Sequence, residues 1–256
     1  MPSQWLRYPG QRLWIRWLLR RVAGIASVSE ASRQDFLRTY RVPPSRVVTI
    51  PIGTECGDLA PRDERRRRLG NAAGIDGASP IVVHVGSFTP EKNQRWMVEA
   101  FTRVLEKRPD ARLVLIGEGP LRPEVAAVVA SRGLDDRVRM LGPREDAHEL
   151  VGGADVLVLP SLTEGLPGVV LEAAAREVPA VASDVGGVSE AVEDGRTGFL
   201  VPLGDFETFV KRVVALLEDP VLARRMGAAA RARVRERFDL PRVVDTFETF
   251  YRELAS

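Results

Sequence analysis

The chain lacks several features that would assign it to a class at once. Its single cysteine, Cys56, cannot form an internal disulfide, which is typical of a reducing compartment. A formal net charge of +2 is close to neutral and gives no general attraction to nucleic acid. No apolar run approaches the ~20 residues of a membrane-spanning helix, and Trp and Arg interrupt any signal-peptide core at the start. We therefore expect a cytoplasmic protein without a nucleic-acid partner.

Residues that commonly hold metals are also scarce. The two histidines, His84 and His148, lie far apart in the sequence, and no Asp-X-Asp motif occurs. Metal sites draw on clusters of such ligands, so we expect no metal and no other cofactor. A lone histidine beside a strand's glycine, as His84 is, is more typical of a structural residue.

Buried strands and helices alternate from Ser79 onward. The strands are predicted at 81–85, 112–116, 138–141, 156–159, 180–182 and 199–201. The helices are predicted at 92–106, 120–131, 147–153, 168–177, 188–193, 206–217, 220–236 and 240–254. This alternation favours an α/β fold, a doubly wound, Rossmann-like parallel sheet that binds its ligand at the carboxyl ends of the strands.

We predict three parts, at 1–78, 79–238 and 239–256, the last being a C-terminal helix. The first part holds a helix near 30–39, a strand at 47–52 and a charged linker at 61–73, too little to bury a core of its own. We interpret the run from Arg65 to Arg68 as a solvated helix face in this linker, not as a nucleic-acid site.

The stretch TEGLPGVVLEA at 163–173 places two carboxylates, Glu164 and Glu172, on either side of a Gly/Pro loop that runs into a helix. Exposed amides at a helix start bind phosphate, and the helix dipole favours the anion. Carboxylates beside such a loop can accept hydrogen bonds from flanking hydroxyls, which suggests a sugar nucleotide. From these residues alone, a glycosidase acid–base pair stays open, and so does a simple helix-start carboxylate.

Glycine turns follow other strands. The segment VHVGSFTPEKN places Lys92 at the predicted start of a helix, where it can meet a diphosphate. A solvated first-turn lysine is the alternative interpretation. The turn GEGP at 117–120 is a weaker signal, because its glycines are also explained by the turn itself.

Five stretches in this order resemble the retaining glycosyltransferases of the GT-B fold, in particular family 4. They are VGSFTPEKN, GEGP, EGLPGVVLEAAA, GGVSE and DGRTGFLV, and the earlier SVSEASRQDF and TIPIGTE resemble the link between that family's two domains. The resemblance runs from about Ser27 to the C-terminus. It implies the C-terminal half of a GT-B fold, with most of the N-terminal acceptor domain missing. The implied reaction is sugar transfer, with retention, from a UDP-, GDP- or ADP-sugar to an unknown glycan or lipid-linked acceptor.

The resemblance also implies residue roles. Glu172 would bind the ribose hydroxyls, while Glu164 and Lys92 would be catalytic, Glu164 at the donor sugar and Lys92 at the diphosphate. The whole implied donor site comprises Gly86, Ser87, Lys92, Arg144, Gly165, Leu166, Pro167, Gly168, Val169 and Glu172. Ser87 departs from the family, which commonly has arginine there, so we expect weaker diphosphate binding unless Arg95 or Arg144 reaches the site.

Two questions about partners follow. The chain is expected to be a transferase. Three explanations of the missing half stay open: a truncated gene or fragment, a donor-binding subunit with a separate acceptor-domain partner, or a degenerate nucleotide-binding module without turnover. Near the N-terminus, apolar and basic residues take different faces of one helix: Leu13, Trp14, Trp17 and Leu18 against Arg12, Arg16 and Arg20. We favour packing of this helix against the missing domain over peripheral contact with the anionic inner face of a membrane.

Overall fold

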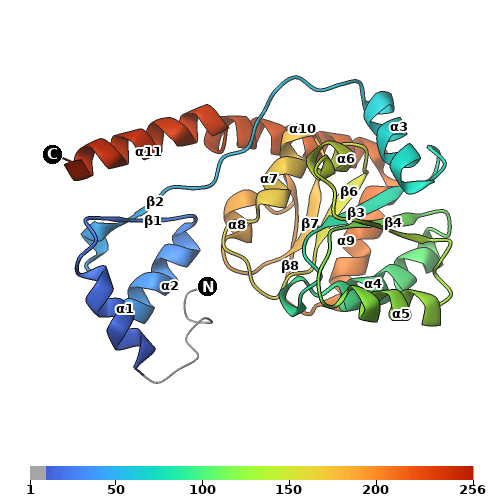
Figure 1. The fold of residues 1–256 in the computed structure, drawn as a ribbon. Helices are drawn as coiled ribbons and strands as arrows, with labels where there is room; N and C mark the ends of the chain where they lie inside the picture. The colour runs from blue at the N-terminus through green and yellow to red at the C-terminus, as the bar shows by residue number, and fades with distance from the viewer. Residues whose placement is uncertain (1–9, 256) are drawn as a thin grey trace.

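The computed structural model describes residues 10–255, except the side chain of Arg12. A small first module lies beside a larger α/β module, and the last helix, α11 (Leu240–Ala255), runs from the second module over the first (Figure 1). We call residues 10–52 the first module and residues 62–237 the second module.

The second module is built on one parallel sheet. Its strands are β3 (Ile81–Val85), β4 (Arg112–Ile116), β5 (Val138–Gly142), β6 (Val156–Leu159), β7 (Ala180–Ser183) and β8 (Gly198–Val201). The six strands take the order β5-β4-β3-β6-β7-β8, and every neighbouring pair is parallel. Each strand begins and ends within one residue of its predicted bounds, and the predicted doubly wound sheet is confirmed.

Helices cover both faces of this sheet because its strands are apolar on both sides. One face packs against α3 (Arg62–Ala73), α6 (Ala147–Val151), α7 (Gly168–Ala175) and α8 (Val188–Ala191). The other packs against α4 (Gln94–Lys107), α5 (Arg122–Ser131) and α9 (Phe206–Glu218), while α10 (Pro220–Arg237) contributes to both cores. In β3, Ile81 and Val83 face the first core and Val82 faces the second, as the two-residue period of a strand requires.

The first module is small. It consists of α1 (Gln11–Leu19), β1 (Ile25–Ser27), α2 (Glu30–Tyr40) and β2 (Val47–Thr49), with β1 and β2 paired in parallel. The sequence analysis missed β1 and made β2 too long, because strands of three residues carry almost no periodic signal. The predicted C-terminal helix is confirmed: α11 packs on this module, where Phe250 and Leu254 crowd Gly24.

Helix α3 corrects the predicted solvated linker. Arg65 is only 6% exposed, and it donates to the backbone carbonyl of Gly152 at 2.9 Å and to that of Arg176. These two residues end α6 and α7, so Arg65 satisfies carbonyls that a helix leaves without partners, at the negative end of the helix dipole. Only Arg67 and Arg68 of the run are exposed.

The exposed side of α1 carries large apolar side chains. Leu13, Trp14 and Trp17 are at least half exposed, and Arg21 lies over the Trp17 ring. Within residues 10–255, no helix has both the length and the apolar character that a bilayer crossing demands.

The two modules meet at the start of α2. The backbone N–H groups of Glu30 and Ala31 donate to the two carboxylate oxygens of Glu190, each at 3.0 Å. Ser29 is fully buried and caps the same helix by accepting from the N–H of Ser32. A carboxylate from the second module therefore satisfies the first amides of a helix in the first module, where the dipole favours a negative charge.

Replacing Glu190 with alanine is expected to loosen the first module while leaving the sheet intact. Two amide-to-carboxylate hydrogen bonds are lost, which costs about 1–3 kcal/mol locally. Amide hydrogen exchange should speed up in α2 and β2 but not in β3 or β6. Glu106→Ala, which removes an exposed carboxylate on α4, is the control, and equal protection of α2 in both variants would contradict this role of Glu190.

Candidate functional site

The chain order of the strands creates a crevice in the middle of the sheet. Strands β3 and β6 are neighbours, but the chain runs outward from β3 to β5 before it returns to β6. The loops that leave β3 and β6 therefore diverge, and in open α/β sheets the gap between such loops is the usual binding place. The turn after β3 carries Gly86, Ser87 and Lys92, and the loop after β6 carries Glu164 and continues into α7.

Lys92 and Glu164 meet at this crevice, although they lie 72 positions apart in the sequence. Their Nζ and Oε1 atoms are 2.6 Å apart, and the side chains are 23% and 9% exposed. The prediction that Lys92 starts the helix is wrong. Lys92 ends a short 3₁₀ turn (Pro90–Lys92), because Asn93 takes a left-handed conformation with φ 56° before α4 begins. The two residues predicted to be catalytic thus form one ion pair with each other.

The start of α7 offers unsatisfied backbone donors. The N–H groups of Val170 and Leu171 donate to the carbonyl of Pro167, but those of Gly168 and Val169 contact no acceptor within the described residues. Val170 and Leu171 are buried against the sheet, which fixes the direction of the helix. Free amides at the positive end of a fixed helix can bind a phosphate without rearrangement.

The turn after β3 is held firmly by the turn after β4. The N–H of Gly86 donates to the carbonyl of Ile116 at 3.0 Å, and the N–H of Phe88 donates to that of Glu118 at 2.9 Å. Between them, the N–H of Ser87 has no acceptor in the part of the chain that the structure describes, and Ser87 is exposed. The turn therefore presents an amide donor at Ser87.

The remaining predicted residues lie at the same edge or beside it. Glu172 is half-buried on α7, and its carboxylate makes no hydrogen bond or ion pair to any described residue. Arg144, after β5, forms a two-bond pair with Asp146, at 2.8 Å for each bond. Arg95 pairs with Glu124 on α5. Neither guanidinium forms a hydrogen bond or ion pair with the turn after β3.

Two buried polar residues behind the turn were not predicted as part of the site. His84 is fully buried, and its Nδ1 lies 3.0 Å from the carbonyl of Val158. Burial lowers the pKa of His84 to about 4, so the ring is neutral at physiological pH. Gln94, 1% exposed, contacts both His84 and the carbonyl of Ser87. A signal was present, since Gln94 shares the apolar face of α4 with Met97, Val98 and Phe101.

The described residues offer no cluster of metal ligands. Within residues 10–255, no three side chains of His, Cys, Asp or Glu gather closely enough to hold an ion. His148 is half-exposed on α6, beside Glu149, and His84 is engaged in the core.

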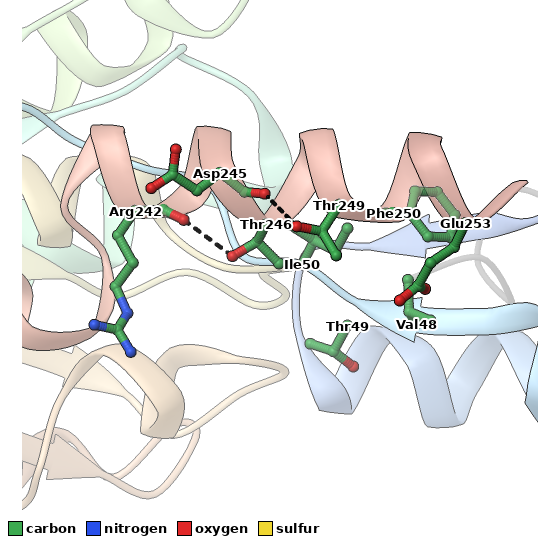
Figure 2. A pocket seen from close by; sticks show the side chains of 9 residues that line it. All are labelled: Val48, Thr49, Ile50, Arg242, Asp245, Thr246, Thr249, Phe250 and Glu253. Carbon is green, nitrogen blue, oxygen red and sulfur yellow. Dashed lines mark hydrogen bonds between the residues drawn. The ribbon is translucent and has the colours of Figure 1, made fainter. Parts of the chain in front are cut away.

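A large hollow lies elsewhere, between β2 and α11 (Figure 2). Its volume is about 570 Å³, and it contains none of the predicted donor-site residues. The hydroxyls of Thr246 and Thr249 at its wall donate to carbonyls of their own helix, at 3.0 and 2.9 Å. The hollow lies between the first module and α11, apart from the predicted donor-site residues, and we do not assign the candidate site to it.

Comparison with known proteins matches both modules to glycosyltransferase families. Residues 79–219 match the family Glycosyl transferases group 1, and residues 2–57 match Glycosyltransferase Family 4. The alpha-D-kanosaminyltransferase of Streptomyces kanamyceticus is 31% identical over 93% of this chain and 62% of its own length. The alpha-maltose-1-phosphate synthase of Mycolicibacterium smegmatis is 34% identical over 91% of this chain and 63% of its own length. The chain thus spans less than two thirds of these relatives.

A solved structure with the same fold contains a nucleotide. The crystal structure of Anabaena HepE in complex with UDP and glucose superposes with a TM-score of 0.86. At 22% identity, it covers 99% of this chain and 69% of the HepE chain, and this similarity establishes the fold.

Proposed function

The chain belongs to the Glycosyl transferases group 1 family, and from this premise we propose that it binds the nucleoside diphosphate of a sugar donor between β3 and β6. The observation that carries the proposal is the contact of Lys92 with Glu164, 2.6 Å long, in the crevice beside the free amides of α7. The turn after β3 carries this cation, and the loop after β6 leads from Glu164 to the unsatisfied N–H groups of α7, so both borders of the crevice carry groups that suit an anion.

The proposed roles follow the positions of the side chains. The amides of Ser87, Gly168 and Val169 bind phosphate oxygens, and Lys92 turns from Glu164 toward the diphosphate. Glu164, released from this ion pair, accepts hydrogen bonds from the donor sugar. Glu172, whose carboxylate is free in the described structure, accepts them from the ribose. Arg144 would have to leave Asp146 to reach the base.

The proposed reaction is transfer of the sugar with retention at the anomeric carbon. Negative charge develops on the departing diphosphate in the transition state, and fixed amides with Lys92 stabilise that charge more than the charge of the bound donor. These groups supply the positive charge from the protein itself, so we propose that no metal is required. The acceptor is proposed to be a glycan or a lipid-linked sugar.

The surface of α1 bears on the partners. Because Trp14 and Trp17 are exposed, we propose that another protein surface, such as an acceptor domain, packs against them. Arg16 and Arg20, beside the apolar face, support the second proposal, a peripheral contact with an anionic membrane surface.

The test is a calorimetric screen of UDP, GDP and ADP, followed by the corresponding sugars. We expect one diphosphate to bind, and we expect Glu172→Ala to weaken it roughly tenfold or more, since a charged partner of the ribose hydroxyls is lost. Glu99→Ala on α4, whose carboxylate pairs with Arg132, should bind as wild type does.

The outcomes separate the alternatives. Absence of binding by every nucleotide, or equal binding by Glu172→Ala and wild type, would overturn the donor site. Nucleotide binding without sugar transfer or donor hydrolysis would point to a donor-binding module that needs a partner.

A further inference from the structure

The hydrogen bonds behind the turn after β3 form one chain with a defined direction. A carbonyl oxygen only accepts, so the contact of His84 Nδ1 with the carbonyl of Val158, at 3.0 Å, places the ring proton on Nδ1. The other ring nitrogen, Nε2, is then an acceptor, and the Gln94 amide donates to it at 3.3 Å. The same Gln94 Nε2 donates to the carbonyl of Ser87 at 2.7 Å.

This direction leaves one atom of Gln94 without a partner. With both hydrogens of Nε2 in use, Oε1 is buried and accepts no hydrogen bond within the described residues. An unsatisfied buried carbonyl disfavours the folded state, and an apolar side chain at this position would avoid the cost. The Gln94 amide therefore acts through its NH₂ group, which donates to His84 and to the Ser87 carbonyl of the turn.

The turn gains a fixed orientation from this contact. The Ser87 carbonyl accepts from Gln94 and from the N–H of Thr89, which orients the peptide between Ser87 and Phe88. The N–H of Lys92 in turn donates to the carbonyl of Thr89 at 3.1 Å. Both the free N–H of Ser87 and the backbone of Lys92 thus belong to the segment that Gln94 holds.

We propose that Gln94 and His84 are positioning residues for diphosphate binding, acting through the Ser87 carbonyl to keep the Ser87 amide and Lys92 in place. The proposal rests on the proposed function of this crevice. Neither side chain touches the ligand, because both are buried. Their effect should be confined to the phosphates and should not extend to the ribose or the base.

Gln94→Met tests the proposal, because methionine has a similar length but cannot donate. We expect the Kd of the nucleoside diphosphate that wild type binds, among UDP, GDP and ADP, to rise roughly three- to tenfold, the loss of one positioning hydrogen bond. The Kd of the matching nucleoside, which lacks phosphate, should change less than twofold. Both are measured by titration calorimetry on the full chain.

His84→Asn is a second variant, which tests the same hydrogen-bond chain if Gln94→Met fails to fold. Asparagine keeps a donor for the Val158 carbonyl but is too short to accept from Gln94, so a smaller rise in the diphosphate Kd is expected. Val104→Ala removes buried side-chain volume from the same helix and is the control for general destabilisation. It should lower the Tm without changing either Kd.

Each outcome decides the proposal. A diphosphate Kd unchanged in both Gln94→Met and His84→Asn overturns it, and so does a nucleoside Kd that rises by the same factor. If wild type binds no nucleotide, the proposed function fails, which is a different result. A rise confined to the diphosphate supports the positioning role.

Discussion

Lys92→Met is expected to weaken nucleoside diphosphate binding by roughly ten- to a hundredfold, the range for losing a hydrogen bond between charged groups. Lys92 is the cation of the crevice ion pair, and no other Lys or Arg occurs in the turn at 86–93. Arg95 and Arg144 pair with Glu124 and Asp146 and form no hydrogen bond or ion pair with the turn after β3. With a single cation at the turn, its loss should affect affinity more than it would in a site with two. Titration calorimetry with the diphosphate and its nucleoside measures the effect.

The ion pair complicates this variant and also supplies its control. Without Lys92, the Glu164 side chain, 9% exposed, has no cation beside it, and we expect the fold to lose about 1–3 kcal/mol. Adding Glu164→Gln removes the stranded charge. The double variant should therefore regain stability in urea unfolding but not diphosphate affinity. Recovery of affinity in the double variant would show that Lys92 acts only by pairing with Glu164, and would contradict its role at the diphosphate.

The positions that could be predicted from the sequence share a physical cause. Continuous apolar runs such as 156–159 are favoured only where both faces of a strand are covered, so they predicted the parallel sheet directly. Parallel strands end at one edge of a sheet, so residues that follow different strands, such as Lys92 and Glu164, can approach one another. These two residues form an ion pair, and the family matches confirm the predicted resemblance.

The contacts that the sequence did not predict have a different cause, because each of them forms only in the tertiary fold. Arg65 was predicted to be solvated since its run of four arginines is strongly polar, but its guanidinium meets the ends of two helices that lie far along the chain. Gln94 interrupts the apolar face of α4, and its side chain donates a hydrogen bond to the Ser87 carbonyl. Glu190 lies in a motif of the family resemblance, yet its partners are amides of a helix some 160 positions earlier. Residue type gave the chemistry of these groups but not their partners.

Gly117→Ala is expected to destabilise the second module by roughly 3–5 kcal/mol, the largest stability effect that we predict. Gly117 has φ +137°, a conformation that side chains disfavour, and a Cβ there would lie 2.1 Å from the carbonyl oxygen of Gly86. That atom is backbone in the turn that carries Ser87, so it can move only if the turns after β3 and β4 separate. The donor site and the stability of the sheet thus depend on the same close approach. Urea unfolding followed by circular dichroism measures the loss.

Two other glycines separate the cost of backbone strain from the cost of the steric clash in Gly117→Ala. Gly133 also has a positive φ, +65°, but a Cβ there meets nothing within 4 Å, so Gly133→Ala should cost only about 1–2 kcal/mol of backbone strain. Gly77 has neither a positive φ nor a close neighbour, and Gly77→Ala should be nearly neutral. If Gly117→Ala were no more destabilising than Gly133→Ala, the two turns would be able to part freely. A turn that parts freely could not hold the Ser87 amide in place, so the same measurement also bears on how rigidly the proposed diphosphate site is built.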